Sequence, residues 1–227
     1  MSWTLDEIQA QIASIIDQTA TAPSATSDDY ALRRTLVNRA LVDYGETYDW
    51  PHLLREFNSI NIGNTVNSLT TIALPTDFRK LASYPNITWD GTNTSQFSQV
   101  DLTKVGQYSS EDKYLYILKS GPTYTAVIHS PTLASGASIY LSYYASPGSL
   151  ASPTSATVCP DPTYLVQKAL YYLYQATEDS RLSEADGKAE MILQRMLENE
   201  VVRGEAYADG RVKNWQETSW NFRIGRD

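Results

Sequence analysis

A chain of 227 residues, with 42% hydrophobic and 19% charged residues, is long enough to bury a hydrophobic core and too apolar to be disordered throughout. Its net charge of -8 argues against a protein that binds nucleic-acid phosphates over much of its surface. Cys159 is the only cysteine, which excludes an intramolecular disulfide and a cluster of several thiolates on one metal. The first twenty residues lack a basic start, and no stretch approaches about 18 apolar residues, so we expect neither secretion nor a membrane segment.

The N-terminus predicts a short amphipathic helix. Thr4 and Glu7 have the spacing of a capping box, in which each side chain accepts a hydrogen bond from the other residue's backbone. The helix should therefore begin at residue 5. Isoleucines recur at helical spacing from Ile8 to Ile16, which gives the helix one apolar stripe that needs a packing partner.

A second helix is expected after a break that contains Pro23. Ser27 or Asp28 can cap it, and Gly45 followed by Pro51 should end it. Its apolar stripe consists of Leu32, Leu36, Val37, Ala40, Leu41 and Tyr44. Two antiparallel helices should therefore form the N-terminal part.

From residue 56 the apolar residues recur at every second position, which is typical of strands. Residues 56–62 and 69–74 flank Gly63 and Asn64, and this pattern predicts a β-hairpin that ends at residues 75–78. Residues 101–105 could form one helical turn. Further strands are expected at residues 87–89, 114–118, 124–129 and 138–144.

Helical spacing returns near the C-terminus. Asp161 is a candidate N-cap with Pro162 at the first helical position, and Leu165, Ala169, Leu170 and Leu173 form the buried stripe. Residues 183–186, SEAD, resemble a second capping box that leads into a fourth helix. The intervening Ser- and Pro-rich segment is expected to be a linker.

We therefore predict an α+β fold in which the N- and C-terminal helix pairs form one four-helix bundle. An antiparallel β-sandwich or barrel-like region is inserted in the chain between the two pairs, and an extended tail follows the last helix. The expected parts are the helices within residues 1–55, the β domain 56–146, the linker 147–160, the helices within residues 161–208 and a docking tail 209–227.

No motif in the sequence points to catalysis or to a cofactor. His52 and His129 are the only histidines and lie 77 positions apart, so no metal-binding spacing such as HxxxH is present. A nucleophile elbow, a P-loop and a GxGxxG sequence are also missing. We expect a protein that is not an enzyme and that needs neither metal nor cofactor, although a carboxylate site without a motif remains an alternative.

The C-terminal tail differs in character from the rest of the chain. Residues 211–227 carry a charge of +2 and combine cations with large apolar side chains, the residue types that dominate binding hot spots. We expect the tail to dock onto another subunit, and the alternative is that it folds back on its own domain. The predicted docking residues are Arg211, Lys213, Trp215, Trp220, Phe222, Arg223, Ile224 and Arg226.

A second set of residues is predicted to pack the helices or the subunits together. Aromatic side chains at helical spacing could stack sugars or bases, but they more often fill a core or a subunit interface. The predicted packing residues are Leu32, Leu36, Trp50, Tyr164, Tyr171, Leu173, Ile192 and Met196.

Five short sequences, in this order, resemble those of head-to-tail adaptors of tailed phages, including the group called tail tubular protein A. They are RRTLVNR at residues 33–39 with YDW at 48–50, LPTDF at 74–78, YYASP at 143–147, CPDPTY at 159–164, and residues 169–175. Each is short, and together they span most of residues 28–200.

The resemblance implies a neck protein of the virion that is assembled in the host cytoplasm. It implies a ring, with twelve copies expected, whose C-terminal tails reach the portal protein while other surfaces receive the next tail or nozzle protein. Genomic DNA would pass through the ring without specific binding, and an acidic channel wall suits such passage because it repels phosphates.

One alternative belongs to a different class of function. The chain contains sixteen Tyr and five Trp, and a Tyr-rich β region could be a carbohydrate- or receptor-binding module of a phage tail component.

Overall fold

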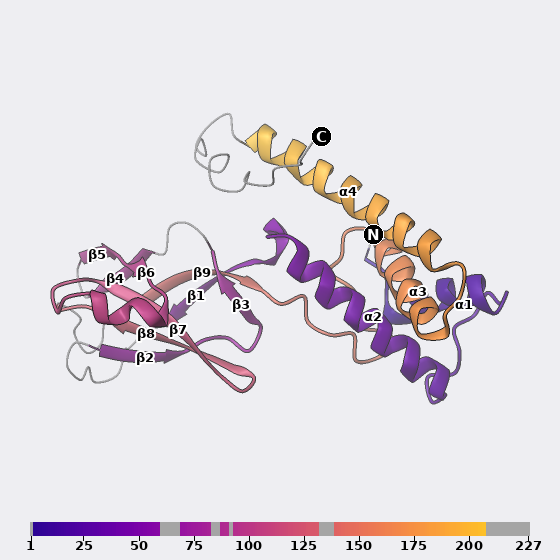
Figure 1. Cartoon of the computed structure of the whole chain (residues 1–227), viewed down its shortest axis with the longest axis horizontal. Helices are drawn as coiled ribbons and strands as arrows, with labels where there is room; N and C mark the ends of the chain where they lie inside the picture. Colours follow the sequence, from indigo (N-terminus) through magenta and orange to yellow (C-terminus); the bar gives the residue numbers. More distant parts are fainter. Residues whose placement is uncertain (1, 60–68, 83–86, 91–92, 132–138, 208–227) are drawn as a thin grey trace. The chain divides into compact units, whose positions relative to one another are not determined.

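The computed structural model describes residues 2–59, 69–82, 87–90, 93–131 and 139–207. The chain divides into two units, of which unit 1 comprises Met1–Leu41 and Ser149–Asp227 and unit 2 comprises Val42–Gly148. Long helices gather in unit 1 and strands in unit 2, so the protein is a mixed α+β protein (Figure 1). No helix among the described residues is long and apolar enough to cross a lipid bilayer.

The helices of the described residues come from both ends of the chain. They are α1 (Leu5–Ile16), α2 (Asp28–Thr47), α3 (Thr163–Thr177) and α4 (Leu182–Tyr207), together with the short 3-10 helices η1 (Pro51–Leu53) and η2 (Leu102–Gln107). The boundary between the units falls within α2, after Leu41. The helical turn expected at residues 101–105 is confirmed by η2, and Asp101 caps it.

The start of α1 confirms the predicted capping box. The Thr4 hydroxyl accepts a hydrogen bond from the Glu7 backbone at 3.3 Å, and the Glu7 carboxylate accepts one from the Thr4 backbone at 2.7 Å. Leu5, Ile8 and Ile12 are buried along one side of the helix. The spacing of polar and apolar residues therefore determines both where α1 begins and which face it buries.

Within residues 147–160, which were predicted to be a linker, the chain from Leu150 onward contacts the helices of unit 1, to which it belongs. The Leu5 backbone at the start of α1 donates to the carbonyl of Ser155 at 2.9 Å. Leu150 is buried, and the Asn38 side chain pairs with its backbone in both directions, at 3.2 and 2.7 Å. The segment therefore satisfies donors at a helix start and ties α2 to the C-terminal half of the chain.

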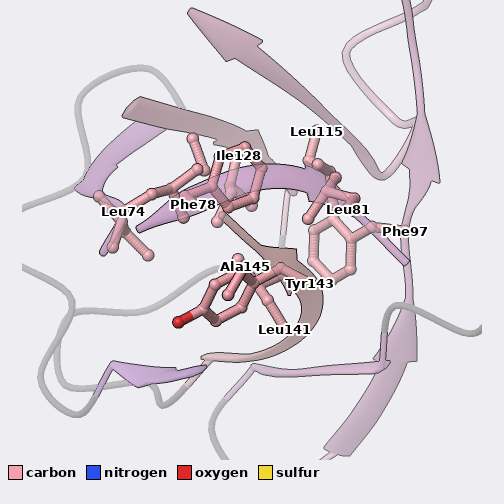
Figure 2. Packing of buried hydrophobic residues seen from close by; sticks show 11 residues of the cluster. Leu74, Phe78, Leu81, Phe97, Leu115, Ile128, Leu141, Tyr143 and Ala145 are labelled. Carbon is pink, nitrogen blue, oxygen red and sulfur yellow. The ribbon is translucent and has the colours of Figure 1, made fainter. Parts of the chain in front are cut away.

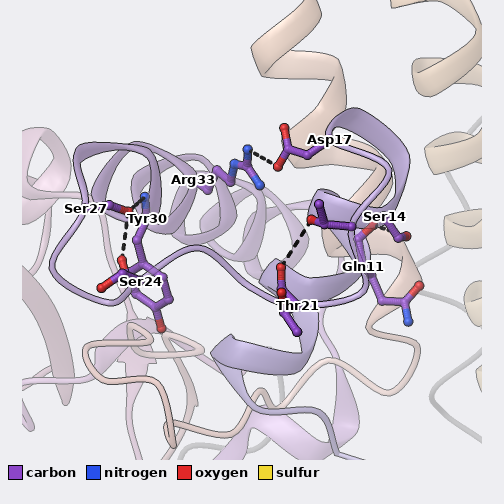
Figure 3. A network of polar contacts seen from close by, with 9 residues as sticks. Gln11, Ser14, Asp17, Thr21, Ser24, Ser27, Tyr30 and Arg33 are labelled. Atoms are coloured by element: carbon purple, nitrogen blue, oxygen red, sulfur yellow. Dashed lines mark hydrogen bonds and ion pairs between the residues drawn. The ribbon is translucent and has the colours of Figure 1, made fainter.

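The start of α2 also follows the sequence. The Ser27 hydroxyl accepts a hydrogen bond from the Tyr30 backbone at 3.2 Å, which makes Ser27 the cap (Figure 3). Arg33, on the next turn, donates to Asp17 at the end of α1 at 2.7 Å (Figure 3). This ion pair holds the two N-terminal helices at the loop that joins them.

α2 continues through Gly45 and ends at Thr47, between Gly45 and Pro51, the two residues predicted to close this part of the chain. A Cβ atom at Gly45 would lie 2.6 Å from Cδ of Pro147, which is too close for any other residue. Gly45 is therefore a point of close packing within unit 2. It does not end the helix.

Three small sheets are described in unit 2. The first sheet has the strand order β1 (Leu54–Ser59), β9 (Ile139–Ala145) and β3 (Phe78–Leu81). The second has the order β2 (Leu69–Ala73), β8 (Thr123–His129), β7 (Tyr114–Ser120) and β6 (Ser98–Gln99). The third consists of β4 (Ile87–Asp90) and β5 (Asn93–Gln96). β4, β7, β8 and β9 confirm predicted strands, whereas β3, β5 and β6 were not predicted. β6 pairs in parallel with β7, so this sheet is not purely antiparallel.

The predicted hairpin of residues 56–62 and 69–74 was wrong. β1 pairs with β9, where Leu54 faces Tyr144, and β2 pairs with β8, where Leu69 faces His129. The two strands thus belong to different sheets. Alternation of apolar residues shows that a segment is a strand but does not identify its partner, which here lies far away in the sequence.

One apolar cluster joins strands from the two larger sheets (Figure 2). Leu115 and Ile128, from β7 and β8, are buried together with Leu141 and Tyr143 from β9. Phe78 stacks on Tyr143 with ring centroids 5.6 Å apart. These contacts give unit 2 its own hydrophobic core.

The capping box expected at residues 183–186 was also wrong. α4 begins at Leu182, so Ser183 already lies inside the helix. The Asp179 side chain accepts from the Arg181 backbone at 2.9 Å, and its carbonyl accepts from Leu182 at 3.1 Å. Asp179, four residues upstream of the predicted cap Ser183, therefore offers a competing cap that sets the start of α4.

Candidate interaction surfaces

Unit 1 is built on α3, which packs against α4 and against α1. Tyr164, Leu165 and Ala169 are among its buried residues. The Lys168 side chain donates to Asp186 of α4 at 3.1 Å, while its Nζ lies 4.5 Å from the ring centroid of Tyr171. These contacts order the outer side of the α3–α4 pair.

Arg39 connects α2 to α3. Its guanidinium carbon lies 3.9 Å from the ring centroid of Tyr172, which is 6% exposed. The stack uses the flat face of the guanidinium, whose N–H groups point outward from its edge, and Arg39 as a whole is exposed. No ion pair to Arg39 is found among the described residues.

Asp161 organises the start of α3. Its carboxylate accepts hydrogen bonds from the Thr163 backbone at 3.1 Å and from the Thr163 hydroxyl, and it forms an ion pair with Arg195 of α4. Burial raises the pKa of Asp161, but the hydrogen bonds from Thr163 and Arg195 outweigh it and hold the pKa below its ordinary value. The charged carboxylate thus fixes α4 alongside the first turn of α3.

In unit 2, an aromatic group follows the end of α2. Trp50 is fully buried, stacks on Tyr44 at 4.6 Å between ring centroids, and donates its indole N–H to the Tyr44 carbonyl at 2.7 Å. The Tyr44 hydroxyl lies 3.0 Å from Nε2 of His52. This aromatic group therefore provides a hydrogen-bond donor to a carbonyl at the C-terminal end of α2, and it packs the end of α2 against η1.

A charged group lies beside it in unit 2. Asp49 forms ion pairs with Arg79 at 3.0 Å and with Lys80 at 2.7 Å. Both cations also lie 5.8 Å from the ring centroid of Tyr144, which is buried. Burial, followed by the charge of Asp49, raises the pKa of Tyr144. The group links the end of α2 to β3 and β9.

The tyrosines of β7 and β8 largely stack on their neighbours. Tyr114 lies 4.7 Å from His129 and 5.2 Å from Tyr108, measured between ring centroids. Burial raises the pKa of Tyr114, which is 7% exposed. Tyr108 and Tyr140 remain exposed. Most of this aromatic area therefore stabilises unit 2 and is not presented to a ligand.

Large apolar side chains are exposed on both units. In unit 1, Leu32 of α2 is 51% exposed and Met191 of α4 is 69% exposed. In unit 2, Leu102 of η2 and Tyr108 are exposed. Single exposed apolar residues are ordinary, but those that share a stripe with a complementary charge indicate a contact surface.

The predicted packing residues fall into three groups. Trp50, Tyr164 and Met196 are buried, Trp50 in unit 2 and the other two in unit 1. Leu36, Tyr171, Leu173 and Ile192 are half-buried, and Leu32 is exposed. The predicted docking residues lie outside the described residues, namely Arg211, Lys213, Trp215, Trp220, Phe222, Arg223, Ile224 and Arg226.

Sequence reasoning missed the contacts that join the helices. Arg39 was noted only within the sequence RRTLVNR, and its partner Tyr172 is distant in the chain. Asp161 was expected to be a cap, but the approach of Arg195 was not. No local pattern signals such pairs, because each depends on how helices far apart in sequence pack.

The part of the chain that the structure describes contains no group of three His, Cys, Asp or Glu side chains placed to hold a metal ion. Cys159 is 2% exposed, and burial raises the pKa of its thiol to about 12. The contacts described above join the helices by ion pairs and by stacked rings.

A family model described as SU10 adaptor protein matches residues 3–216, which is nearly the whole chain. The chain belongs to the SU10 adaptor protein family. It is thus a phage adaptor protein and a structural component of the virion, and it interacts with other structural proteins of the phage. A search of curated proteins gives no significant match.

Proposed function

We propose that this SU10-family adaptor forms a ring under the portal of a tailed phage and docks to the portal through its C-terminal tail. The ring, with twelve copies expected, surrounds the path of the genomic DNA and is the platform to which the next tail or nozzle protein attaches. In each copy the four helices act as one bundle, and the β unit is an insertion in the chain between the two helix pairs. This arrangement places the protein in the neck of the virion, after assembly in the host cytoplasm.

The course of α4 carries the proposal. The ion pair of Arg195 with Asp161 places Arg195 beside the first turn of α3. α4 nevertheless continues to Tyr207, and residues 196–207 span about 18 Å of helix at 1.5 Å per residue. Figure 1 shows α4 running on beyond α3. The end of α4 therefore lies well past the ion pair that joins this helix to α3, and docking of the residues that follow to a different protein requires such an extension.

The composition of the C-terminal tail also supports docking to another protein. Cations lie on both sides of the segment that holds Trp215, Trp220 and Phe222, whereas the whole chain has a net charge of -8. Aromatic and arginine side chains are the residues that bury most effectively at protein interfaces. The acidic balance of the rest of the chain suits a channel through which DNA slides without specific binding.

The direct test compares binding of the full-length chain and of a chain truncated after residue 210 to the cognate portal ring. The truncation retains α4 and should keep its fold, as judged by circular dichroism, while losing portal binding. A full-length Trp215→Ala/Trp220→Ala/Phe222→Ala variant should fail in the same way. Undiminished binding by the truncated chain would refute docking through the tail.

The alternative of a receptor-binding module rests on the exposed Tyr108 and Tyr140 of unit 2. The family match favours the adaptor role, and Tyr114 is already stacked between neighbouring rings. A glycan array probed with the full-length chain separates the two functions, since an adaptor should bind no glycan and a receptor-binding module should bind a defined set.

A further inference from the structure

Two exposed stripes on unit 1 have the same spacing. On α2, the stripe consists of Leu32, Thr35 and Arg39, all of which are exposed. Steps of three and four residues bring such positions onto one side of a helix, and the same steps form the contact seam of paired helices. We define these three residues as the α2 stripe.

The matching residues on α4 are Met191, Gln194 and Glu198, all of which are also exposed. We define them as the α4 stripe. Gly187, one turn earlier on the same side, has no atoms near its missing side chain. The α4 stripe is therefore open for another helix to approach.

The two stripes are complementary residue by residue. Leu32 and Met191 are 51% and 69% exposed and would cover each other. Arg39 and Glu198 carry opposite charges and have no ion-pair partner among the described residues. The guanidinium of Arg39 is fixed over Tyr172 by its face, so its N–H edge is preorganised to donate to a carboxylate.

The two stripes cannot be expected to meet within one chain. α3 contacts α2 through Arg39 and Tyr172, and it also packs against α4, so it lies between them (Figure 1). α2 and α4 run in the same direction across α3 (Figure 1). A second copy turned by a modest angle would therefore bring its α4 nearly parallel to α2 of the first copy.

We propose that the α2 stripe of one copy binds the α4 stripe of the next copy, with helices parallel. In this register Leu32 packs on Met191, Thr35 faces Gln194, and Arg39 pairs with Glu198. Because the two stripes are different surfaces, the contact is heterologous and repeats around a closed ring.

This inference rests on the proposed function, since it assigns the contact that would close the ring. Disulfide trapping tests it on the full-length chain assembled with its cognate portal. The natural Cys159 is buried and should not contribute to cross-linking. The Leu32→Cys/Met191→Cys variant, once oxidised, should give a ladder of covalent oligomers in steps of 25.4 kDa that collapses with reductant.

A matched pair of variants fixes the direction of the helices. Thr35→Cys/Gln194→Cys should cross-link as efficiently, whereas Thr35→Cys/Gly187→Cys, which fits only an antiparallel contact, should not. Preferential cross-linking of the Gly187 variant would overturn the parallel register. Each single-cysteine variant should remain without a ladder.

The charge pair supplies an independent readout. Glu198→Arg alone should reduce incorporation of the chain into portal-bound particles at least tenfold, and Arg39→Glu/Glu198→Arg should restore most of it. If normal assemblies form but neither cysteine pair gives a ladder, the stripes are not the contact, while the adaptor function stands. If the unmodified chain does not assemble on the portal at all, both the adaptor function and this contact are refuted.

Discussion

The guanidinium of Arg39 lies 3.9 Å over the ring of Tyr172 and thereby fastens α2, from the N-terminal part of the chain, to α3, from the C-terminal part. The residues between these two helices include all of unit 2 that follows the end of α2. This contact, together with the pairing of Asn38 and Leu150, allows unit 1 to be assembled from both ends of the chain.

Removal of the Arg39 stack should weaken unit 1. Arg39→Ala is expected to lower the free energy of unfolding by about 0.5–1 kcal/mol, the range for an exposed cation–π contact. Arg39→Lys keeps the charge but loses the planar stack, so its free energy of unfolding should lie between those of Arg39→Ala and the natural chain. Urea unfolding followed by circular dichroism measures the differences, and equal stability of Arg39→Ala and the natural chain would contradict this role.

Two glycines in helices should respond to alanine in opposite directions. Gly45→Ala places a methyl group within 3 Å of the Pro147 ring, and we expect a loss of about 1–3 kcal/mol in the free energy of unfolding. Gly187→Ala meets open space in α4 and should gain about 0.5–1 kcal/mol from helix propensity. Thermal unfolding of both variants provides the comparison, and stabilisation by Gly45→Ala would contradict the close packing.

The ion pair of Asp161 and Arg195 should make unit 1 sensitive to acid. The pKa of Asp161 is lowered in the folded chain, so the stabilisation is complete above the unfolded value of about 3.9 and is lost as the pH falls through the folded value. Asp161→Asn keeps an acceptor for Thr163 but removes the charge. Its deficit in melting temperature should be present at pH 7 and should shrink below about pH 4; a deficit that grows on acidification would have the wrong sign.

Cys159 should be inert in the folded chain. Its pKa of about 12 leaves almost no thiolate at pH 8, and the side chain is 2% exposed. Reaction with a thiol reagent should therefore be at least about 100-fold slower than in denaturant. A Val158→Cys variant, whose position is 40% exposed, is the matched positive control. Rapid labelling of the natural chain without denaturant would show that this part of unit 1 opens readily.

Local signals predicted the local structure well. The Thr4 and Glu7 box and the Ser27 cap gave the starts of two helices, because each depends on neighbouring residues alone. The hairpin failed because β1 pairs with β9, and the choice of partner depends on which apolar faces close the core of unit 2. Ser183 failed because Asp179 offered a better cap nearby.

The candidate contact surfaces were less accessible to sequence reasoning. The tail was recognisable from its mixture of aromatic and basic residues, since that composition is unusual for a free end in water. The stripes on α2 and α4 were not recognisable. Exposure of Leu32 and Met191 follows from which sides of their helices α3 covers, and only the packed unit shows this.

The native mass of the full-length chain mixed with its cognate portal ring tests the adaptor function most directly. The account predicts one discrete complex, heavier than the portal ring by a whole number of 25.4 kDa chains that matches the symmetry of the portal. A portal ring that keeps its own mass in the presence of excess chain would contradict the account.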